Sequence, residues 1–189
     1  MCVMDNNGNP EKGKILISEP FLNDPNFKRS IILLGEHNEN GSIGFILNKP
    51  TKLKLNQVID DFPDFEAPIY LGGPVQINTI QFIHKAGEIV DGSTEIADGL
   101  YWGGNFGYLK LLIEAKQVEP DDFRFFIGYS GWDEGQLEDE LKLNSWIVAA
   151  TSIDNIFSEE PDKLWREILK HMGKKFAILA SFPENPSVN

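Results

Sequence analysis

Apolar residues along the chain fall mostly into short runs, a pattern typical of β-strands. The runs at 29–36 and 42–48 are continuously aliphatic, which predicts that both faces of this part of the sheet are covered. The Asn40–Gly41 pair between them indicates a hairpin, because both residues accept positive φ angles. Strands are predicted over 14–18, 29–36, 42–48, 69–71, 79–85, 95–102, 123–129 and 146–151.

Other segments repeat their apolar residues with the period of an α-helix. In the last of these segments, Pro161 suits the first turn of a helix and Gly173 suits its end. The residues that follow, 176–189, are predicted to form a short strand and a tail. Helices are predicted over 53–59, 106–117, 135–144 and 158–173.

The order of these elements predicts an α+β fold, a single domain with a mixed, largely antiparallel β-sheet flanked by helices. Strands outnumber helices and do not alternate regularly with them, which argues against a doubly wound parallel sheet. The predicted domain spans 13–182, between an N-terminal tail at 1–12 and a C-terminal tail at 183–189.

The composition excludes several classes of function but adds little to the prediction of the fold. The chain has 189 residues, of which 41% are hydrophobic and 24% charged, and its net charge is −12. An acidic surface repels a phosphate backbone, so direct nucleic-acid binding is not expected. The single cysteine, Cys2, excludes an intramolecular disulfide. With no signal peptide and no apolar run long enough to span a bilayer, we predict a cytoplasmic protein without membrane contact.

The densest group of polar and aromatic residues lies in 128–146, GYSGWDEGQLEDELKLNSW. Its first five residues resemble the G-x-S-x-G elbow of α/β-hydrolases, but the last glycine is missing. The order of a hydrolase triad also fails, because His37 and His84 precede Ser130 and only His171 follows it. Ser130 is therefore interpreted as a turn serine and not as a nucleophile.

The acidic residues of the same stretch could hold a hard cation, with His37 and His84 as further ligands. They are also typical of a solvated helix face, whose first carboxylates interact favourably with the helix dipole. On this interpretation we predict no metal site and no cofactor. The acidic residues concerned are Asp133, Glu134, Glu138, Asp139 and Glu140.

Two glycine pairs, Gly72–Gly73 and Gly103–Gly104, could expose backbone N–H groups to an anion. Neither matches a nucleotide-binding fingerprint, and Pro74 has no N–H to donate. Both pairs are interpreted as tight turns at strand ends. Carboxylates beside the tryptophans would also suit glycoside chemistry, but such residues more often pack in a core or line a binding groove.

Three segments in this order, 13–50, YLGGPVQ at 70–76 and 128–146, resemble the AlgH/YqgE family of bacterial proteins. The resemblance covers about 13–181. It implies a single-domain α+β protein whose motifs line one shared groove. The family has no established biochemical activity, although its AlgH label implies transcriptional regulation of alginate synthesis. Members commonly carry alanine at the position of Ser130, and His84 matches a histidine of the family.

We therefore predict a binding groove in which glycines turn the chain while aromatic and polar side chains contact a ligand. A purely structural corner is the alternative interpretation of 128–140. The predicted groove residues are Asn48, Pro50, Gly72, Gly73, Pro74, Val75, His84, Gly128, Tyr129, Gly131, Trp132, Gly135, Gln136 and Glu138.

The resulting functional hypothesis is a non-catalytic binding or regulatory protein that binds a protein partner or a small ligand. Regulation through a protein partner suits the acidic charge better than direct DNA binding does. The alternative is an enzyme of unassigned class in which His84 or His37 acts with Glu138 as an acid–base pair. Such an enzyme requires the histidine and the carboxylate to meet in a pocket.

Overall fold

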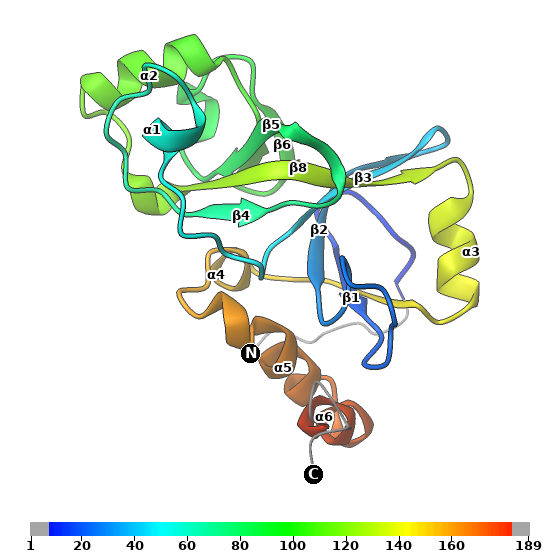
Figure 1. Ribbon diagram of the computed structural model, residues 1–189. Helices are drawn as coiled ribbons and strands as arrows, with labels where there is room; N and C mark the ends of the chain where they lie inside the picture. Colours follow the sequence, from blue (N-terminus) through cyan, green and yellow to red (C-terminus); the bar gives the residue numbers. More distant parts are fainter. Residues whose placement is uncertain (1–7, 183–189) are drawn as a thin grey trace.

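The computed structural model describes residues 8–182, so the predicted C-terminal tail and most of the predicted N-terminal tail lie outside it (Figure 1). The strands of the described part form one sheet. They are β1 (Ile15–Ser18), β2 (Ile31–Asn38), β3 (Gly41–Ile46), β4 (Ile69–Leu71), β5 (Val75–His84), β6 (Thr94–Ala97), β7 (Leu100–Trp102), β8 (Phe123–Asp133) and β9 (Trp146–Ala149).

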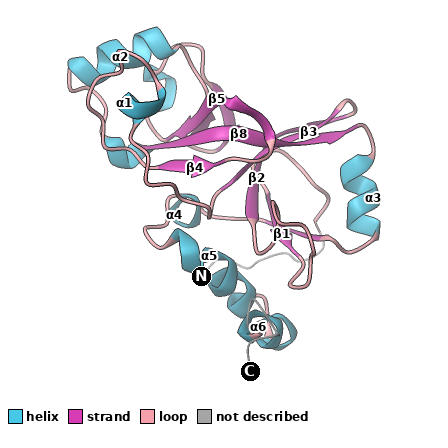
Figure 2. Cartoon of the chain, in the orientation of Figure 1, coloured by secondary structure: helices cyan, strands magenta, loops and turns pink. Residues whose placement is uncertain are grey.

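Helices lie on both sides of this sheet, as the colours of Figure 2 show. They are α1 (Leu55–Val58), α2 (Phe106–Glu114), α3 (Gln136–Lys142), α4 (Ile153–Ile156), α5 (Pro161–His171) and α6 (Lys174–Ser181), with 3-10 turns η1 (Gly87–Ile89) and η2 (Pro120–Asp122). No helix among the described residues is both long and apolar enough to cross a membrane.

The strand order is β6-β7-β5-β8-β3-β2-β1-β9, and β4 pairs with β8 outside this path. The β4–β8 pair is parallel, while the other pairs are antiparallel. This arrangement confirms the predicted α+β class with a mixed, largely antiparallel sheet.

The long strand β8 joins the two halves of the sheet. Its first half lies between β4 and β5, so that Ile69 and Phe82 both pair with Phe125. Its second half pairs with β3, where Ser130 lies opposite Gly44. Residues 128–133 therefore continue the strand. The prediction that the strand ends at residue 129 and that Ser130 lies in a turn is wrong, because β3 supplies a pairing partner that the local sequence does not reveal.

Two further predictions need correction. The strand predicted over 95–102 is a hairpin of β6 and β7, because Gly99 takes a φ angle of 71° in the turn between them. The strand predicted after residue 175 is the helix α6, which packs against α5 and buries Ala180. The predicted β2–β3 hairpin is present, with Asn38 paired to Gly41.

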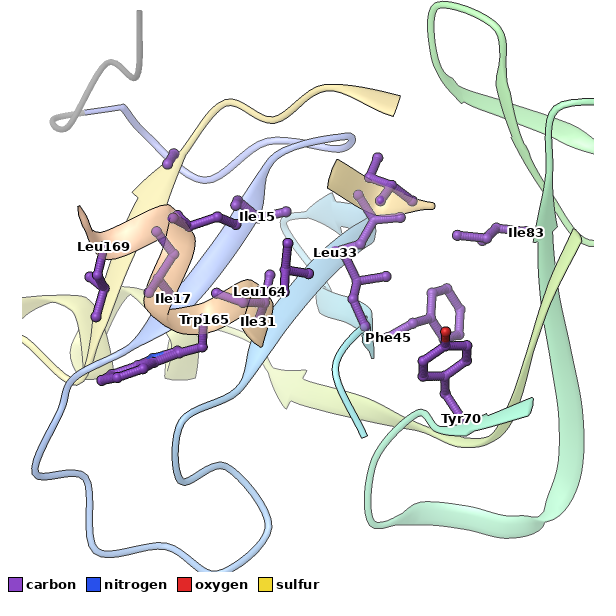
Figure 3. Packing of buried hydrophobic residues seen from close by; sticks show 14 of the residues in the cluster. Ile15, Ile17, Ile31, Leu33, Phe45, Tyr70, Ile83, Leu164, Trp165 and Leu169 are labelled. Atoms are coloured by element: carbon purple, nitrogen blue, oxygen red, sulfur yellow. The ribbon is translucent and has the colours of Figure 1, made fainter. Parts of the chain in front are cut away.

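Each face of the β1–β2 part of the sheet contributes to a separate core. Ile15 and Ile17 point toward α5, where Leu164 and Trp165 cover them (Figure 3). Leu16, between them, belongs to a second core that includes Trp132, Leu137 and Trp146. A third core packs α2 on β5 and β8. The continuous aliphatic runs of the sequence are thus explained by burial on both faces.

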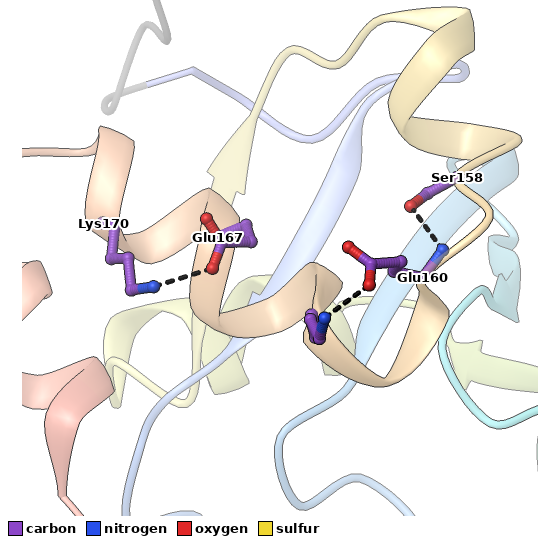
Figure 4. Close-up of polar contacts among 5 residues, drawn as sticks. Ser158, Glu160, Glu167 and Lys170 are labelled. Carbon is purple, nitrogen blue, oxygen red and sulfur yellow. Dashed lines mark hydrogen bonds and ion pairs between the residues drawn. The ribbon is translucent and has the colours of Figure 1, made fainter.

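The outer side of α5 carries paired charges at helical spacing (Figure 4). Lys170 contacts Glu167 at 2.7 Å, and Lys163 contacts Glu160 in the same way one turn from the start of the helix. The N–H of Glu160 donates to the hydroxyl of Ser158. Exposed pairs at this spacing contribute only a few tenths of a kcal/mol each, so burial of the apolar side holds α5 in place.

Candidate functional site

Two predicted groove segments meet where the link from β4 to β5 crosses β8. The N–H of Gly72 donates to the carbonyl of Ile127, and the Ser130 hydroxyl donates to the carbonyl of Gly72 at 3.0 Å. A Cβ atom on Gly72 would lie 2.3 Å from the carbonyl oxygen of Gly128. Glycine is required here because two backbones are in contact, and the buried Ser130 hydroxyl serves the same contact.

The crossing leaves no space for a ligand between these two segments, both of which were predicted to line one groove. A Cβ atom on Gly73 would lie 2.3 Å from the backbone of Tyr129, and one on Gly128 would lie 2.6 Å from the carbonyl oxygen of Val75. Val75 pairs directly with Tyr129. The structure therefore brings these two segments together, but the contact between them is closed.

Next to this crossing, β5 makes a wide bulge that points an apolar side chain into solvent. Six residues of β5, from Val75 to Ile80, lie opposite only three residues of β8, from Tyr129 to Ile127, and Gln76 takes a φ angle of 47°. The Thr79 hydroxyl donates to the carbonyl of Gln76 at 2.8 Å and closes the bulge. Ile77, at its tip, is 70% exposed.

The second half of the 128–146 stretch is organised around Glu140, which was not among the predicted site residues. Its carboxylate accepts hydrogen bonds from the indole N–H groups of Trp132 at 2.9 Å and Trp146 at 2.6 Å. The amide of Gln136 donates to the same carboxylate, and its oxygen accepts from the N–H of Asp133. Trp132 and Trp146 are buried and pack edge to face. This region is a structural corner. Because a buried indole N–H usually needs a hydrogen-bond acceptor, the two tryptophans beside an acidic helix are the signal that could have identified Glu140.

One of the two predicted histidine–carboxylate pairs is present. His37 Nε2 lies 3.7 Å from Glu138 Oε1, and His37 Nδ1 contacts the Ser42 hydroxyl at 2.8 Å. The pair lies where the β2–β3 hairpin meets α3. Five surface cavities of the described residues have volumes of about 360 to 720 Å³, and neither His37 nor Glu138 lines any of them.

His84 lies apart from the other motif residues. It occupies the end of β5 opposite Phe123, whereas Val75 is opposite Tyr129, so the two ends of β5 are separated by about 20 Å of strand. The ring is fully buried, stacks on Tyr101 and Phe123, and contacts the carbonyl of Gly103 at 3.2 Å. Burial lowers the pKa of His84 to about 4, against the opposing effect of the Gly103 hydrogen bond.

Asn48 and Pro50 help to shape the chain beside β2. The Asn48 side chain accepts from the N–H of Ile31 and donates to the carbonyl of Arg29, both at 2.8 Å. Arg29 has a φ angle of 51°, so Asn48 stabilises a strained turn. Pro50 forms an isolated bridge with Tyr70 and is exposed. Gly135, with a φ angle of 72°, precedes α3 and has open space around it.

The acidic residues 133–140 do not gather around one point. Within the described range 8–182, no group of three or more His, Cys, Asp or Glu side chains could share a metal ion. Glu140 is engaged by the two indoles, and Asp139 contacts Lys142 at 2.7 Å.

Comparison with known proteins places this architecture in a family. The model of the AlgH-like family matches residues 15–177. The chain belongs to the AlgH-like family. A UPF0301 protein of Cytophaga hutchinsonii is 45% identical over 179 residues, which cover 94% of this chain and 98% of the relative. A UPF0301 protein of Chlorobium phaeobacteroides is 42% identical over 179 residues, covering 95% and 96%.

Solved structures of two other proteins show the same AlgH-like fold. The solution structure of the AlgH protein of Pseudomonas aeruginosa, itself a UPF0301 protein, superposes with a TM-score of 0.72 at 29% identity, covering 91% of this chain and 94% of that one. The crystal structure of protein DIP2367 of Corynebacterium diphtheriae has a TM-score of 0.76 at 22% identity, covering 93% and 94%. The second likeness concerns the fold alone.

An exposed apolar residue directly after the YLGGPVQ segment of this AlgH-like chain, Ile77, was missed by the sequence interpretation. It lies between the polar residues Gln76 and Asn78, which fit neither face of a regular alternating strand. An isolated isoleucine between two amide side chains directly after Gly72–Val75 is the signal that could have indicated a bulge.

Proposed function

We propose that this AlgH-like chain is a non-catalytic binding protein that contacts a protein partner through the β5 bulge. The carrying observation is the 70% exposure of Ile77 on a backbone held by Gly73, Gln76 and Gly128 at positive φ angles. A left-handed φ angle at Gln76 costs about 1 kcal/mol or more, and such strain persists where the surrounding structure enforces it.

The surroundings of Ile77 suit a protein contact better than a small ligand. The neighbouring side chains of Gln76 and Asn78 are exposed and offer hydrogen-bond donors and acceptors around an apolar centre. This combination is typical of protein interfaces, where an apolar anchor is surrounded by polar groups. Ile77 lines none of the five cavities described above, which also favours a contact with a surface.

The remaining motif residues support this proposal by having roles in the fold. Gly72 and Gly128 allow the backbone crossing, while Trp132 and Gln136 bind Glu140. On this view the motifs of the sequence build and stiffen the platform for the bulge. A cytoplasmic, indirectly regulatory protein with a net charge of −12 fits such a role, because the charge disfavours direct contact with DNA.

Affinity capture with the purified wild-type chain and two matched variants tests the proposal. Ile77→Ser removes the exposed apolar tip, and Leu143→Ser removes an apolar side chain that is 77% exposed at the end of α3. We expect a partner that is retained by wild type and Leu143→Ser and is lost with Ile77→Ser. If all three proteins retain the same partners, the bulge is not the binding surface.

An acid–base enzyme is a second candidate, favoured only by the 3.7 Å contact between His37 and Glu138. Its test is a screen of hydrolase and isomerase substrate classes with wild type, His37→Gln and Glu138→Gln. An activity that falls at least 100-fold in both variants would establish the enzyme and refute the non-catalytic proposal.

A further inference from the structure

A cavity of about 460 Å³ lies between the start of β8, the start of β4 and the turn that joins α4 to α5, the region below β4 in Figure 1. It is separate from the β5 bulge, and Tyr70 is the one residue of the motif segments that lines it. The lining residues are Pro68, Tyr70, Lys85, Asp121, Phe123, Arg124, Phe157, Ser158, Glu159 and Pro161.

Arg124 forms the charged wall of this cavity. Its side chain is buried, with 3% of the residue exposed, in a strand segment whose neighbours are phenylalanines. Its guanidinium donates to the carbonyls of Ser158 at 2.5 Å and Leu47 at 3.4 Å. Within residues 8–182 it makes no ion pair with a carboxylate.

A buried cation without a counter-ion retains a strong attraction for an anion. Transfer of a guanidinium out of water is costly, and two neutral carbonyls replace only part of its hydration. The long distance to Leu47 also leaves donor capacity, because a guanidinium carries five N–H groups. An anionic group in the cavity would form a charge-assisted hydrogen bond with it.

The other walls are aromatic, and one of them adds a second donor. The guanidinium lies 4.7 Å from the centre of the Tyr70 ring and 5.6 Å from that of Phe157. The Tyr70 hydroxyl makes no hydrogen bond to any other described residue, although Tyr70 is only 3% exposed. Burial raises the pKa of Tyr70, against the opposing effect of Arg124, so the hydroxyl remains a donor. Figure 3 shows the Tyr70 side chain among the buried residues of the first core.

The charges at the rim select the kind of anion. Lys85 lies 4.7 Å from the centre of the Phe157 ring and contacts Asp122 at 3.2 Å, so its charge is already balanced. Asp121 and Glu159 are exposed and line the opening. Two carboxylates at the rim repel phosphates and other anions of higher charge, and the aromatic walls favour an apolar body.

We propose that this cavity binds a small organic monocarboxylate, whose carboxylate contacts the Arg124 guanidinium and the Tyr70 hydroxyl while its apolar body packs against Phe157. Such a ligand matches both the single buried cation and the aromatic walls. The cavity is large enough for such a ligand, because pockets that bind small molecules begin at about 300 Å³. The site does not depend on the partner surface at Ile77.

A titration of the full chain with phenylacetate, followed by amide NMR, tests the site. We expect saturable shifts at the start of β8 and in 157–161. The neutral isostere phenylacetamide should bind at least ten-fold more weakly, and inorganic phosphate should give no saturable shift. Equal binding of the acid and the amide, or saturation by phosphate without saturation by phenylacetate, would overturn the assignment.

Three variants locate the interaction. Arg124→Met should weaken phenylacetate binding at least ten-fold. Glu159→Gln, at an exposed rim position, should tighten binding about two- to three-fold because a like charge is removed. Glu134→Gln is the matched control, an exposed glutamate beside α3 that lies at the other end of β8 from the cavity.

The comparison of Glu159→Gln with Glu134→Gln still tests the site if Arg124→Met fails to fold. A tighter affinity in Glu159→Gln, with wild-type affinity in Glu134→Gln, supports the site. The same affinity in wild type, Glu159→Gln and Glu134→Gln refutes it, as does any loss of binding in Glu134→Gln equal to that in Arg124→Met.

Discussion

The two halves of the 128–146 stretch are held in place by different interactions. In the first half, Gly128 lies against the backbone of Gly73 and Val75, with no room for a side chain. In the second half, the Glu140 carboxylate accepts hydrogen bonds from the side chains of Trp132, Gln136 and Trp146. The first half requires glycine because a Cβ atom would not fit, whereas the second half requires a carboxylate that accepts hydrogen bonds from the indole N–H groups.

This difference shows why a single sequence motif need not form a single functional wall. Gly128 and Gly135 both take left-handed φ angles, of 64° and 72°. Gly128 is enclosed by two carbonyl oxygens, while nothing lies within 4 Å of a Cβ atom on Gly135. Similar residues in one motif thus serve a close backbone approach at one end and a turn before a helix at the other.

The largest effect is expected from alanine at Gly128, and alanine at Gly135 is the matched comparison. Gly128→Ala would place a Cβ atom 2.6 Å from the carbonyl oxygen of Val75, in addition to the cost of the φ angle. We expect a loss of about 3 kcal/mol or more in the free energy of unfolding. Gly135→Ala should lose only about 1 kcal/mol, the cost of the left-handed backbone alone. Urea unfolding of both variants measures the difference, and equal losses would show that the crossing is not tightly packed.

The next effect concerns the side-chain half of the comparison. Glu140→Ala removes the acceptor of two largely buried indole N–H groups, and we expect the free energy of unfolding to fall by about 2 to 3 kcal/mol. Glu138→Ala on the same helix should change it by less than about 0.5 kcal/mol, because its contact with His37 is long and partly exposed. Tryptophan fluorescence during denaturation reports on both, and a similar loss in the two variants would contradict the central role of Glu140.

A smaller, pH-dependent effect is expected at His84, the motif residue that lies outside both halves. Its pKa is lowered to about 4, so the unfolded chain binds a proton below pH 6.5 that the folded chain does not bind until about pH 4. Stability from this group is therefore present above pH 6.5 and is lost as the pH falls toward 4, by about 2 kcal/mol.

His84→Phe, which keeps an aromatic ring between Tyr101 and Phe123, provides the control. Unfolding free energies measured from pH 7 to pH 4 should fall less steeply in the variant than in wild type, since the carboxylates contribute equally to both. An unchanged slope would mean that His84 is already protonated in the folded protein or remains accessible to water.

Much of the fold could be predicted from the sequence, because the pattern of apolar residues is strong within single segments. Continuous aliphatic runs predicted β1, β2 and β3, and the helical period with Pro161 predicted α5. The pairing of 128–133 with β3 could not be predicted, because it depends on contacts between residues about 90 positions apart. For the same reason a strand was predicted where α6 docks on α5, since a short apolar run suits either element.

For the candidate site, the sequence singled out segments that the structure brings into contact, but it did not show what each residue does there. It placed Gly72–Val75 beside Gly128–Gly131 and named the His37–Glu138 pair, both of which the structure brings together. It gave no sign that Glu140 is the centre of the corner, or that Arg124 is buried beside a cavity. These roles depend on which side chains other elements bring near, and a charge in a sequence carries no record of its surroundings.

The motifs of the sequence carried the resemblance to the family, which the comparisons confirmed. The sequence by itself also determined the α+β class, the main strands and the acidic character of this chain. These properties follow from composition, from residue order and from the periodicity with which each segment buries its apolar residues. Only the tertiary structure decided which glycines face a backbone, which carboxylate binds the tryptophans, and which cation faces a cavity. The reason is that burial and close approach are set by distant segments, and they determine whether a polar group serves the fold or remains available to a ligand.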